Sequence, residues 1–86
     1  MNKRDVVALL ISTRSETAMN VQKILTGWGC LIKTRLGIHD GVLDNCSQTG
    51  LVLLEMVGED AKIDEFVRKL NLVKGATAKR ITLKLK

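Results

Sequence analysis

Residues 51–57, Leu-Val-Leu-Leu-Glu-Met-Val, form a nearly continuous apolar run between Gly50 and Gly58. A second run, Asp-Val-Val-Ala-Leu-Leu-Ile, covers residues 5–11. Both are too short to cross a membrane, and neither alternates as a strand with one wet face does. Periodicity alone does not separate a buried strand from a buried helix, but short length, flanking glycine and β-branched content favour strands. We therefore take the two runs as the central strands of one sheet.

Helix signals follow each central strand. Residues 13–16, Thr-Arg-Ser-Glu, fit a capping box, in which a hydroxyl at the N-cap is followed three residues later by glutamate. Asp60 suits the N-cap of a second helix and Asn71 its C-cap. Apolar residues recur at spacings of three and four in both segments, at Ala18, Val21, Leu25 and Trp28, and at Ile63, Phe66, Val67 and Leu70. These stripes predict two amphipathic helices.

Two further segments, 30–38 and 76–85, alternate between apolar and polar residues and predict strands with one wet face. In the first of them, one side is expected to carry Cys30, Ile32, Thr34, Leu36 and Ile38. The polar residues 39–49 read as the loop between two antiparallel strands. The element order is then β-α-β-β-α-β. With the continuous strands inside, it predicts an α+β, ferredoxin-like sandwich of sheet order 4-1-3-2 with both helices on one face. We expect residues 1–86 to form one such domain.

The opposite face of this sheet is expected to be open. Its edges can supply charge through Lys33, Arg35, Arg80 and Lys84, but its centre carries only Glu55, which we expect near Lys33 or Arg35. An apolar strip several side chains wide is unusual on a monomer. The sequence therefore predicts a homo-oligomer, a dimer or tetramer, that covers this face or extends the sheet.

The net charge of +5 lies entirely on the last segment. Nine Lys and Arg balance nine Asp and Glu up to Val73, and the remaining bases are Lys74, Lys79, Arg80, Lys84 and Lys86. One interpretation is protection of an edge strand from unwanted pairing. Another is an anionic partner such as a nucleic acid. The inner strands lack the aromatic residues on which RNA recognition motifs stack bases, which argues against that module.

Candidate chemistry is sparse. His39 and Cys46 flank the same loop and are a candidate pair of metal ligands, whose site another subunit or Cys30 would have to complete. The other interpretation is a loop histidine and a semi-buried thiol. The start of the helix after residues 13–16 suits a carboxylate or phosphate, unless Thr13 and Glu16 occupy its amides. Neither a nucleophile-base set nor a glycine-rich phosphate loop is evident, so we expect no enzyme.

The N-terminus shows no signal peptide, and no run approaches the roughly 20 apolar residues of a membrane span. The two cysteines have no secretory context, which is typical of free thiols in a reducing cytoplasm. The sequence therefore predicts a cytoplasmic protein.

Four short segments, 15–18, 24–29, 33–39 and 46–51, resemble in order and spacing the iron-only hydrogenase system regulators, a family of small stand-alone ACT-like proteins. The resemblance implies a ferredoxin-like fold related to ACT domains and to the C-terminal domain of the nickel-responsive regulator. It also implies oligomers and a regulatory role, such as transcriptional regulation. The chain departs from these relatives in two ways. Arg14-Ser15 stands where amino-acid-sensing ACT domains usually carry glycine, and a single histidine cannot supply the nickel regulator's ligands.

The leading hypothesis is a cytoplasmic, oligomeric, non-catalytic regulatory module. It would bind a small ligand or a partner protein at a subunit interface, with Arg14, Ser15, Arg35 and His39 as candidate contacts. One alternative is a metal-responsive sensor that uses His39 and Cys46 from neighbouring subunits. The other is nucleic-acid binding through the basic last strand, although direct DNA reading would need a partner protein because the chain has no ribbon-helix-helix segment. No cofactor follows from the sequence.

Overall fold

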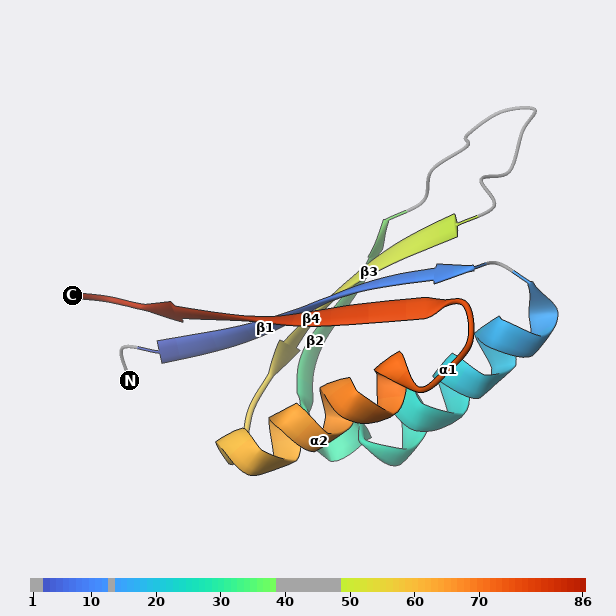
Figure 1. Cartoon of the computed structure of the whole chain (residues 1–86). Helices are drawn as coiled ribbons and strands as arrows, with labels where there is room; N and C mark the ends of the chain where they lie inside the picture. The colour runs from blue at the N-terminus through green and yellow to red at the C-terminus, as the bar shows by residue number, and fades with distance from the viewer. Residues whose placement is uncertain (1–2, 13, 39–48) are drawn as a thin grey trace.

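A computed structural model describes residues 3–12, 14–38 and 49–86. The elements are β1 (Lys3–Ser12), α1 (Ser15–Gly27), the short 3-10 helix η1 (Gly29–Leu31), β2 (Ile32–Ile38), β3 (Thr49–Met56), α2 (Asp60–Asn71) and β4 (Ala76–Lys84) (Figure 1). This order matches the predicted β-α-β-β-α-β pattern. No helix within the described ranges is long and apolar enough to cross a lipid bilayer.

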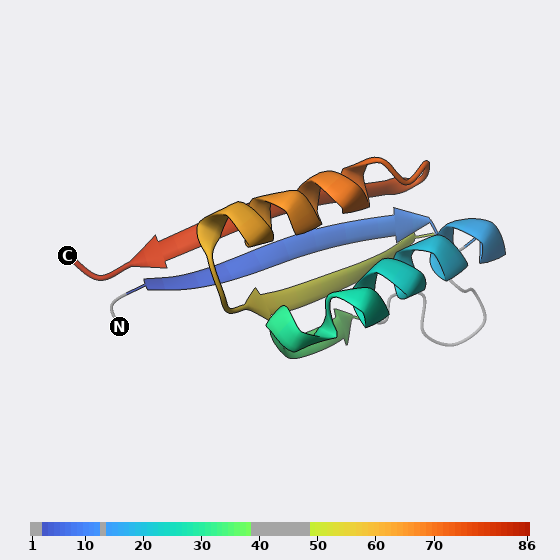
Figure 2. The same cartoon turned by 90° about the horizontal axis from the view of Figure 1, so that it is seen from below.

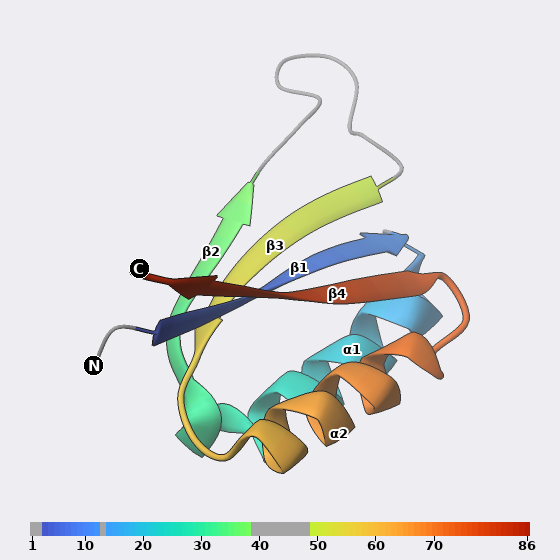
Figure 3. The same cartoon turned by 60° about the vertical axis from the view of Figure 1, so that its left-hand side comes forward.

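The four strands form one antiparallel sheet of order β2-β3-β1-β4, which is the predicted order read from the other edge. Both helices lie against one face of the sheet, and no described element covers the other (Figures 2 and 3). The prediction of a ferredoxin-like sandwich is therefore confirmed. We call these two sides the covered face and the open face.

The core lies between the covered face and the helices. Its fully buried large side chains come from β1, β3 and both helices: Val7, Leu9, Val21, Leu54, Ile63, Phe66 and Leu70. Trp28 packs on Phe66 with ring centroids 5.7 Å apart. The predicted helical stripes thus face the sheet, because each amphipathic helix must bury its apolar side.

The predicted helix ends are wrong in detail. Arg14, not Thr13, is the N-cap of α1, and its side chain makes no capping hydrogen bond; Thr13 lies outside the described residues. Glu59 is the N-cap of α2, and Asp60 is its first residue. Asn71 is the last residue of α2 rather than its C-cap. The Asp60 and Asn71 side chains instead bond to strands, because tertiary partners compete with local capping for the same polar atoms.

The expected alternation of residues 30–38 is also interrupted. Residues 29–31 form η1, so β2 begins at Ile32, and its register against β3 shifts between Ile32 and Thr34. A bulge of this kind reverses the direction of the following side chains. Ile32 therefore packs against the core, whereas Leu36 and Ile38 lie exposed on the open face.

The open face is apolar, as predicted, and Glu55 lies within reach of the charge of Lys33, as expected, but Arg4 is a partner that the sequence did not predict. Glu55 accepts two hydrogen bonds of 2.6 Å from Arg4 of β1, rather than bonds from Lys33 or Arg35. The bonds from Arg4 lower the pKa of Glu55, and the charge of Lys33 lowers it further. Arg35 and Arg80 both turn to the covered face, toward α1 and α2 respectively. The exposed large side chains of the open face are Leu10, Leu36, Ile38, Ile81 and Leu83.

Candidate ligand-binding site

A surface hollow of about 860 Å³ lies where β1 runs into α1. Its walls are the end of β1, the first turns of α1, the start of β3 and the turn between α2 and β4. Arg14, Ser15 and Lys74 contribute to its lining. The hollow therefore combines segments from both halves of the chain.

Three hydrogen bonds fix the shape of this hollow. The Ser12 backbone N–H donates to the Gly75 carbonyl (2.8 Å), and the hydroxyl of buried Thr17 donates to the Lys74 carbonyl (3.0 Å). The Arg14 N–H donates to the Ser12 hydroxyl (3.3 Å). The first two bonds hold the β1–α1 and α2–β4 turns together, and the third lies within the β1–α1 turn.

Gly75 is needed at this junction for two reasons. Its φ of 91° lies in a region that side-chain-bearing residues rarely adopt. A Cβ at this position would also meet the Thr17 Oγ1 at 2.8 Å and the Ser12 Cβ at 3.3 Å. The close approach of the two turns thus depends on the absence of a side chain.

The electrostatics of the hollow favour an anionic group. The N-terminus of α1 points its partial positive charge toward the hollow, and Arg14 and Lys74 add two full charges against the single carboxylate of Glu16. The amides of a helix start together with a guanidinium suit a carboxylate or phosphate. The arrangement is therefore suited to holding a small anion.

The structure brings together two of the four predicted contact residues. Arg14 and Ser15 line the hollow, but Arg35 lies on β2, where its guanidinium donates to the Gln22 side chain at 3.0 Å. His39 lies outside the described residues, as does Cys46, and Cys30 is exposed. Within the described ranges, no group of three or more metal-ligating side chains is present. The metal site at His39 and Cys46 and the other interpretation, a loop histidine and a semi-buried thiol, thus both stay predictions.

Sequence reasoning missed the contributions of Thr17, Lys74 and Gly75. Gly75 was visible only as a boundary between the second helix and the last strand. No local pattern indicates that its turn packs on the start of α1, because these segments lie almost 60 residues apart in the chain. A positive φ and a close contact appear only in the folded chain.

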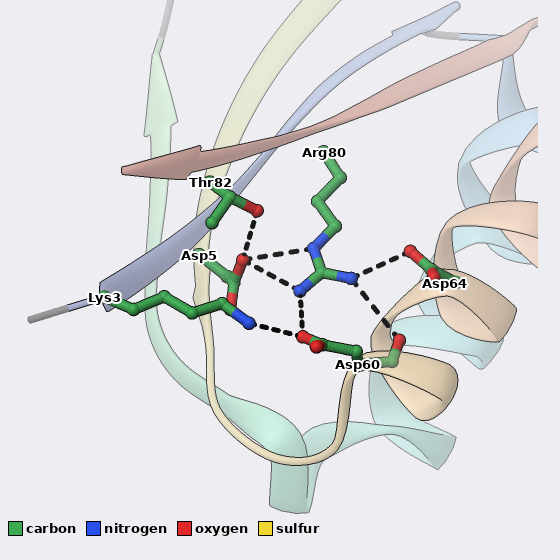
Figure 4. A network of polar contacts seen from close by, with 6 residues as sticks. All are labelled: Lys3, Asp5, Asp60, Asp64, Arg80 and Thr82. Atoms are coloured by element: carbon green, nitrogen blue, oxygen red, sulfur yellow. Dashed lines mark hydrogen bonds and ion pairs between the residues drawn. The ribbon is translucent and has the colours of Figure 1, made fainter. Parts of the chain in front are cut away.

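A second polar group of residues, which we call the Arg80 cluster, ties α2 to the sheet (Figure 4). It lies near the start of β1, whereas the hollow lies at the end of that strand. It consists of Lys3, Asp5, Asp60, Asp64, Arg80 and Thr82. The Arg80 guanidinium donates to Asp5 (2.9 Å), Asp60 (2.6 Å) and Asp64 (2.8 Å). Arg80 is thus already paired with carboxylates. This leaves fewer unpaired cations on the last strand for an anionic partner of the kind that one interpretation of the sequence gave.

The cluster lowers the pKa values of two of its acids, Asp60 and Asp5. Hydrogen bonds from Lys3 and then Arg80 lower the pKa of Asp60 to about 2. Burial raises the pKa of Asp5, but the bonds from Thr82 and Arg80 outweigh it, so this pKa also lies below its ordinary value. These carboxylates are therefore ionised at neutral pH and anchor the cations around them.

With fold and hollow in view, the chain can be compared with known proteins. No protein-family model matches the sequence, and no curated protein matches it. Solved structures do match. The chain is similar to the uncharacterized protein TM1266 from Thermotoga maritima, with a TM-score of 0.81, 20% identity, and coverage of 95% of this chain and 99% of that one.

Two further similar structures carry informative names. The ACT domain from GTP pyrophosphokinase of Chlorobium tepidum matches with a TM-score of 0.68 and 15% identity over 92% of this chain and 96% of that one. CPII, a nitrogen regulatory PII-like protein from Thiomonas intermedia K12 bound to ADP, AMP and bicarbonate, matches with a TM-score of 0.58 and 8% identity over 96% and 88%. At these identities the likeness shows a shared fold, the ACT-like form of the ferredoxin-like sandwich.

Proposed function

We propose that this chain is a cytoplasmic, non-catalytic regulatory module that binds a small anionic ligand in the hollow at the start of α1 and acts as a homo-oligomer. The observation that carries the proposal is the meeting of Arg14, Ser15 and Lys74 at a helix N-terminus. These groups supply charge and hydrogen-bond donors for a carboxylate or phosphate. The proposed site does not use Arg35 or His39. A ligand contact by His39 stays a prediction.

The structural neighbours support a regulatory role. One is an ACT domain of GTP pyrophosphokinase, and another is a nitrogen regulatory protein bound to two nucleotides and bicarbonate, which are all anions. The finer assignment, to regulation of an iron-only hydrogenase system, rests on the resemblance of the sequence segments alone.

The hollow also offers a way to transmit ligand binding. A ligand that contacts both Arg14 and Lys74 would fasten the β1–α1 turn to the α2–β4 turn, and both turns connect directly to strands of the sheet. If ligand binding is coupled to subunit packing, the molecule has two packing states. The ligand then shifts the balance between them by as much as its affinities for the two states differ. The open face, with its exposed leucines and isoleucines, is the surface where we expect copies to pack.

Titration of the purified chain with a panel of anions tests the proposal. The panel holds acetate, bicarbonate, phosphate, several amino acids, AMP and ADP. Calorimetry and thermal unfolding measure the binding of each anion. We expect saturable binding of at least one class, weakened about tenfold in Arg14→Gln because one charge-assisted contact is lost. Lys62→Gln, which removes an exposed cation on α2 away from the hollow, is the matched control and should bind normally. Absence of binding across the panel, or equal losses in both variants, would contradict the proposal.

A further inference from the structure

The outer edge of β4 presents its backbone unevenly. In an antiparallel pair, alternate residues point their N–H and C=O groups away from the neighbouring strand. Ala78 shows which residues do so, because its N–H donates to the Asn71 Oδ1 (2.8 Å) and its C=O accepts from the Asn71 Nδ2 (3.0 Å). The residues two, four and six positions later, Arg80, Thr82 and Lys84, must therefore also present their backbone groups outward.

Asn71 closes the first half of this edge. Its side-chain amide occupies both positions that a further strand would use at Ala78, and the outward N–H of Ala76 donates to the Val73 carbonyl (3.1 Å). Within the described ranges, no comparable backbone bond reaches the outward groups of Arg80, Thr82 or Lys84. The end of β4 also runs past the start of α2, as Figure 2 shows. The edge is thus open only along Arg80–Lys84.

We propose that β4 of a second copy pairs with this open segment, antiparallel, with Thr82 on the two-fold axis. This register sets three pairs of outward residues opposite one another: Arg80 with Lys84, Thr82 with Thr82, and Lys84 with Arg80. A register centred on Ile81 would bring Lys84 opposite Ala78, where Asn71 already lies. A register centred on Leu83 would leave only two such pairs within β4. The Thr82 register is therefore the longest that the fold permits.

The side chains are self-complementary in this register. On the open face, Ile81 and Leu83, which are 46% and 58% exposed, would each lie opposite the other residue of the second copy. Aliphatic cross-strand pairs stabilise a sheet by burying each other. The threonines at position 82 would form a cross-strand pair of the kind that favours sheets. The two-fold axis repeats the Ile81–Leu83 pair, so both exposed apolar residues of each copy are covered by the same contact.

Charges are complementary on the covered face. Lys84 of each copy would lie beside the Arg80 cluster of the other, where three carboxylates are gathered beside a second hollow that the other copy's Lys3, Arg80 and Lys84 line. The Asp60 and Asp64 side chains remain 65% and 68% exposed in one chain, so they are accessible to an incoming ammonium group. Arg80 itself is held by its own carboxylates, which offsets its repulsion of Lys84.

The pairing adds to the homo-oligomer of the proposed function a second contact, at the β4 edge beside the open face, with a stated register, and its tests do not depend on ligand binding. Single cysteines are introduced at Ile81→Cys in one protein and Leu83→Cys in another, both in a background with Cys30→Ser and Cys46→Ser. Opposite non-hydrogen-bonded residues have Cα atoms about 4.5 Å apart, which is within disulfide reach. Mild oxidation of the mixture should give mainly the 81–83 heterodimer.

Thr77→Cys is the matched control, since this exposed residue lies on the same strand in the half closed by Asn71. It should cross-link with neither partner. If the heterodimer does not exceed this control, or if 81–81 and 83–83 homodimers form equally, the register is overturned. Anion binding in the hollow, measured on the same proteins, would show whether the proposed function survives that result.

A charge reversal provides a second test without cysteines. Lys84→Glu should raise the dimer dissociation constant about tenfold in sedimentation experiments. The introduced carboxylate would lie beside the exposed carboxylates of Asp60 and Asp64, whereas the Arg80 opposite it is already paired with its own acids. Lys79→Glu makes the same charge change on the same strand outside the paired segment and should leave the constant within about twofold. Equal effects of the two variants, or a parent chain that stays monomeric at all concentrations, would overturn the pairing.

Discussion

The two faces of the sheet receive similar apolar side chains and treat them differently. Along β1, Val7 and Leu9 point into the core and are fully buried, whereas Leu10 points the other way and is exposed. The same contrast holds in β3 between buried Leu54 and half-buried Leu53. Because the strands are apolar on both sides, only the helices decide which side is covered. The covered face supplies stability, and the open face is available for association.

The ion pairs of the two faces show the same contrast. Arg80 on the covered face has a side chain that is 15% exposed and bonds to Asp5, which is 7% exposed as a residue. On the open face it is the cation that is exposed, since the Arg4 side chain is 65% exposed and that of its partner Glu55 is 17% exposed. A pair shielded from water becomes costly to break from one side, whereas an exposed pair contributes little. The following variants test this difference between the faces, in order of expected effect.

Phe66→Ala should be the most destabilising change. Phe66 is fully buried and packs on Trp28, so the variant loses apolar burial and leaves a cavity, which costs about 3–5 kcal/mol in the free energy of unfolding. Urea unfolding at low protein concentration measures it. Leu36→Ala on the open face is the control and should change the same quantity by less than about 1 kcal/mol. Equal losses at the two positions would show that the open face is as important to the monomer as the core.

Arg80→Met should cost about 2–3 kcal/mol, because it leaves the carboxylate of Asp5 largely buried without its guanidinium partner. Arg4→Met removes the corresponding cation from the open face and should cost less than about 1 kcal/mol. Chemical unfolding of both variants, analysed with a common slope, gives the comparison. A loss in Arg4→Met as large as that in Arg80→Met would remove the distinction between shielded and exposed pairs.

Gly75→Ala should cost about 1–2 kcal/mol, since a Cβ strains the positive φ and crowds the Thr17 hydroxyl. The change should also weaken anion binding, because it pushes apart the two turns that line the hollow. Gly37→Ala on β2 has open space around its Cβ position and is the control. Thermal unfolding and anion titration of both variants report the two effects, and a Gly75→Ala protein with parental behaviour in both would contradict this account.

The smallest expected effect is a pH dependence. The pKa of Asp60 is about 2 in the folded chain, compared with an ordinary value of 3.8, so its ionised form is favoured by folding. The resulting stabilisation is complete above the ordinary pKa and is lost as pH falls from about 4 to about 2. Urea midpoints across this range should fall less steeply for Asp60→Asn than for the parent. Identical slopes would show that Asp60 does not contribute to the acid sensitivity.

The sequence was informative wherever a property repeats along the chain. The two continuous apolar runs and the two alternating segments gave the central and edge strands, and the helical spacing that includes Val21 and Phe66 gave the buried sides of both helices. Local patterns failed where a polar side chain has a choice of partners. Asp60 and Asn71 look like caps in isolation, but the folded chain offers them Arg80 and the backbone of Ala78. Nothing within a few residues of either position indicates that choice.

The candidate site divides in the same way. Arg14 and Ser15 could be selected because a helix start after a strand is a local signal with known electrostatics. Arg35 was placed on the wrong face because the bulge in β2 depends on how that strand pairs with β3, and pairing is not encoded in the alternation itself. Lys74 and Gly75 could not be selected, since their role comes from a turn that packs against a distant one.

Hydrophobic patterning, together with segment length, flanking glycines and β-branched content, therefore predicted the elements, their order and the sheet, because each segment must bury its own apolar surface. The tertiary structure decided which charges are shielded, which half of the outer edge of β4 is closed and where the hollow forms. Those features depend on contacts between residues far apart in the chain, whose distances and directions exist only once the helices lie on one face of the sheet.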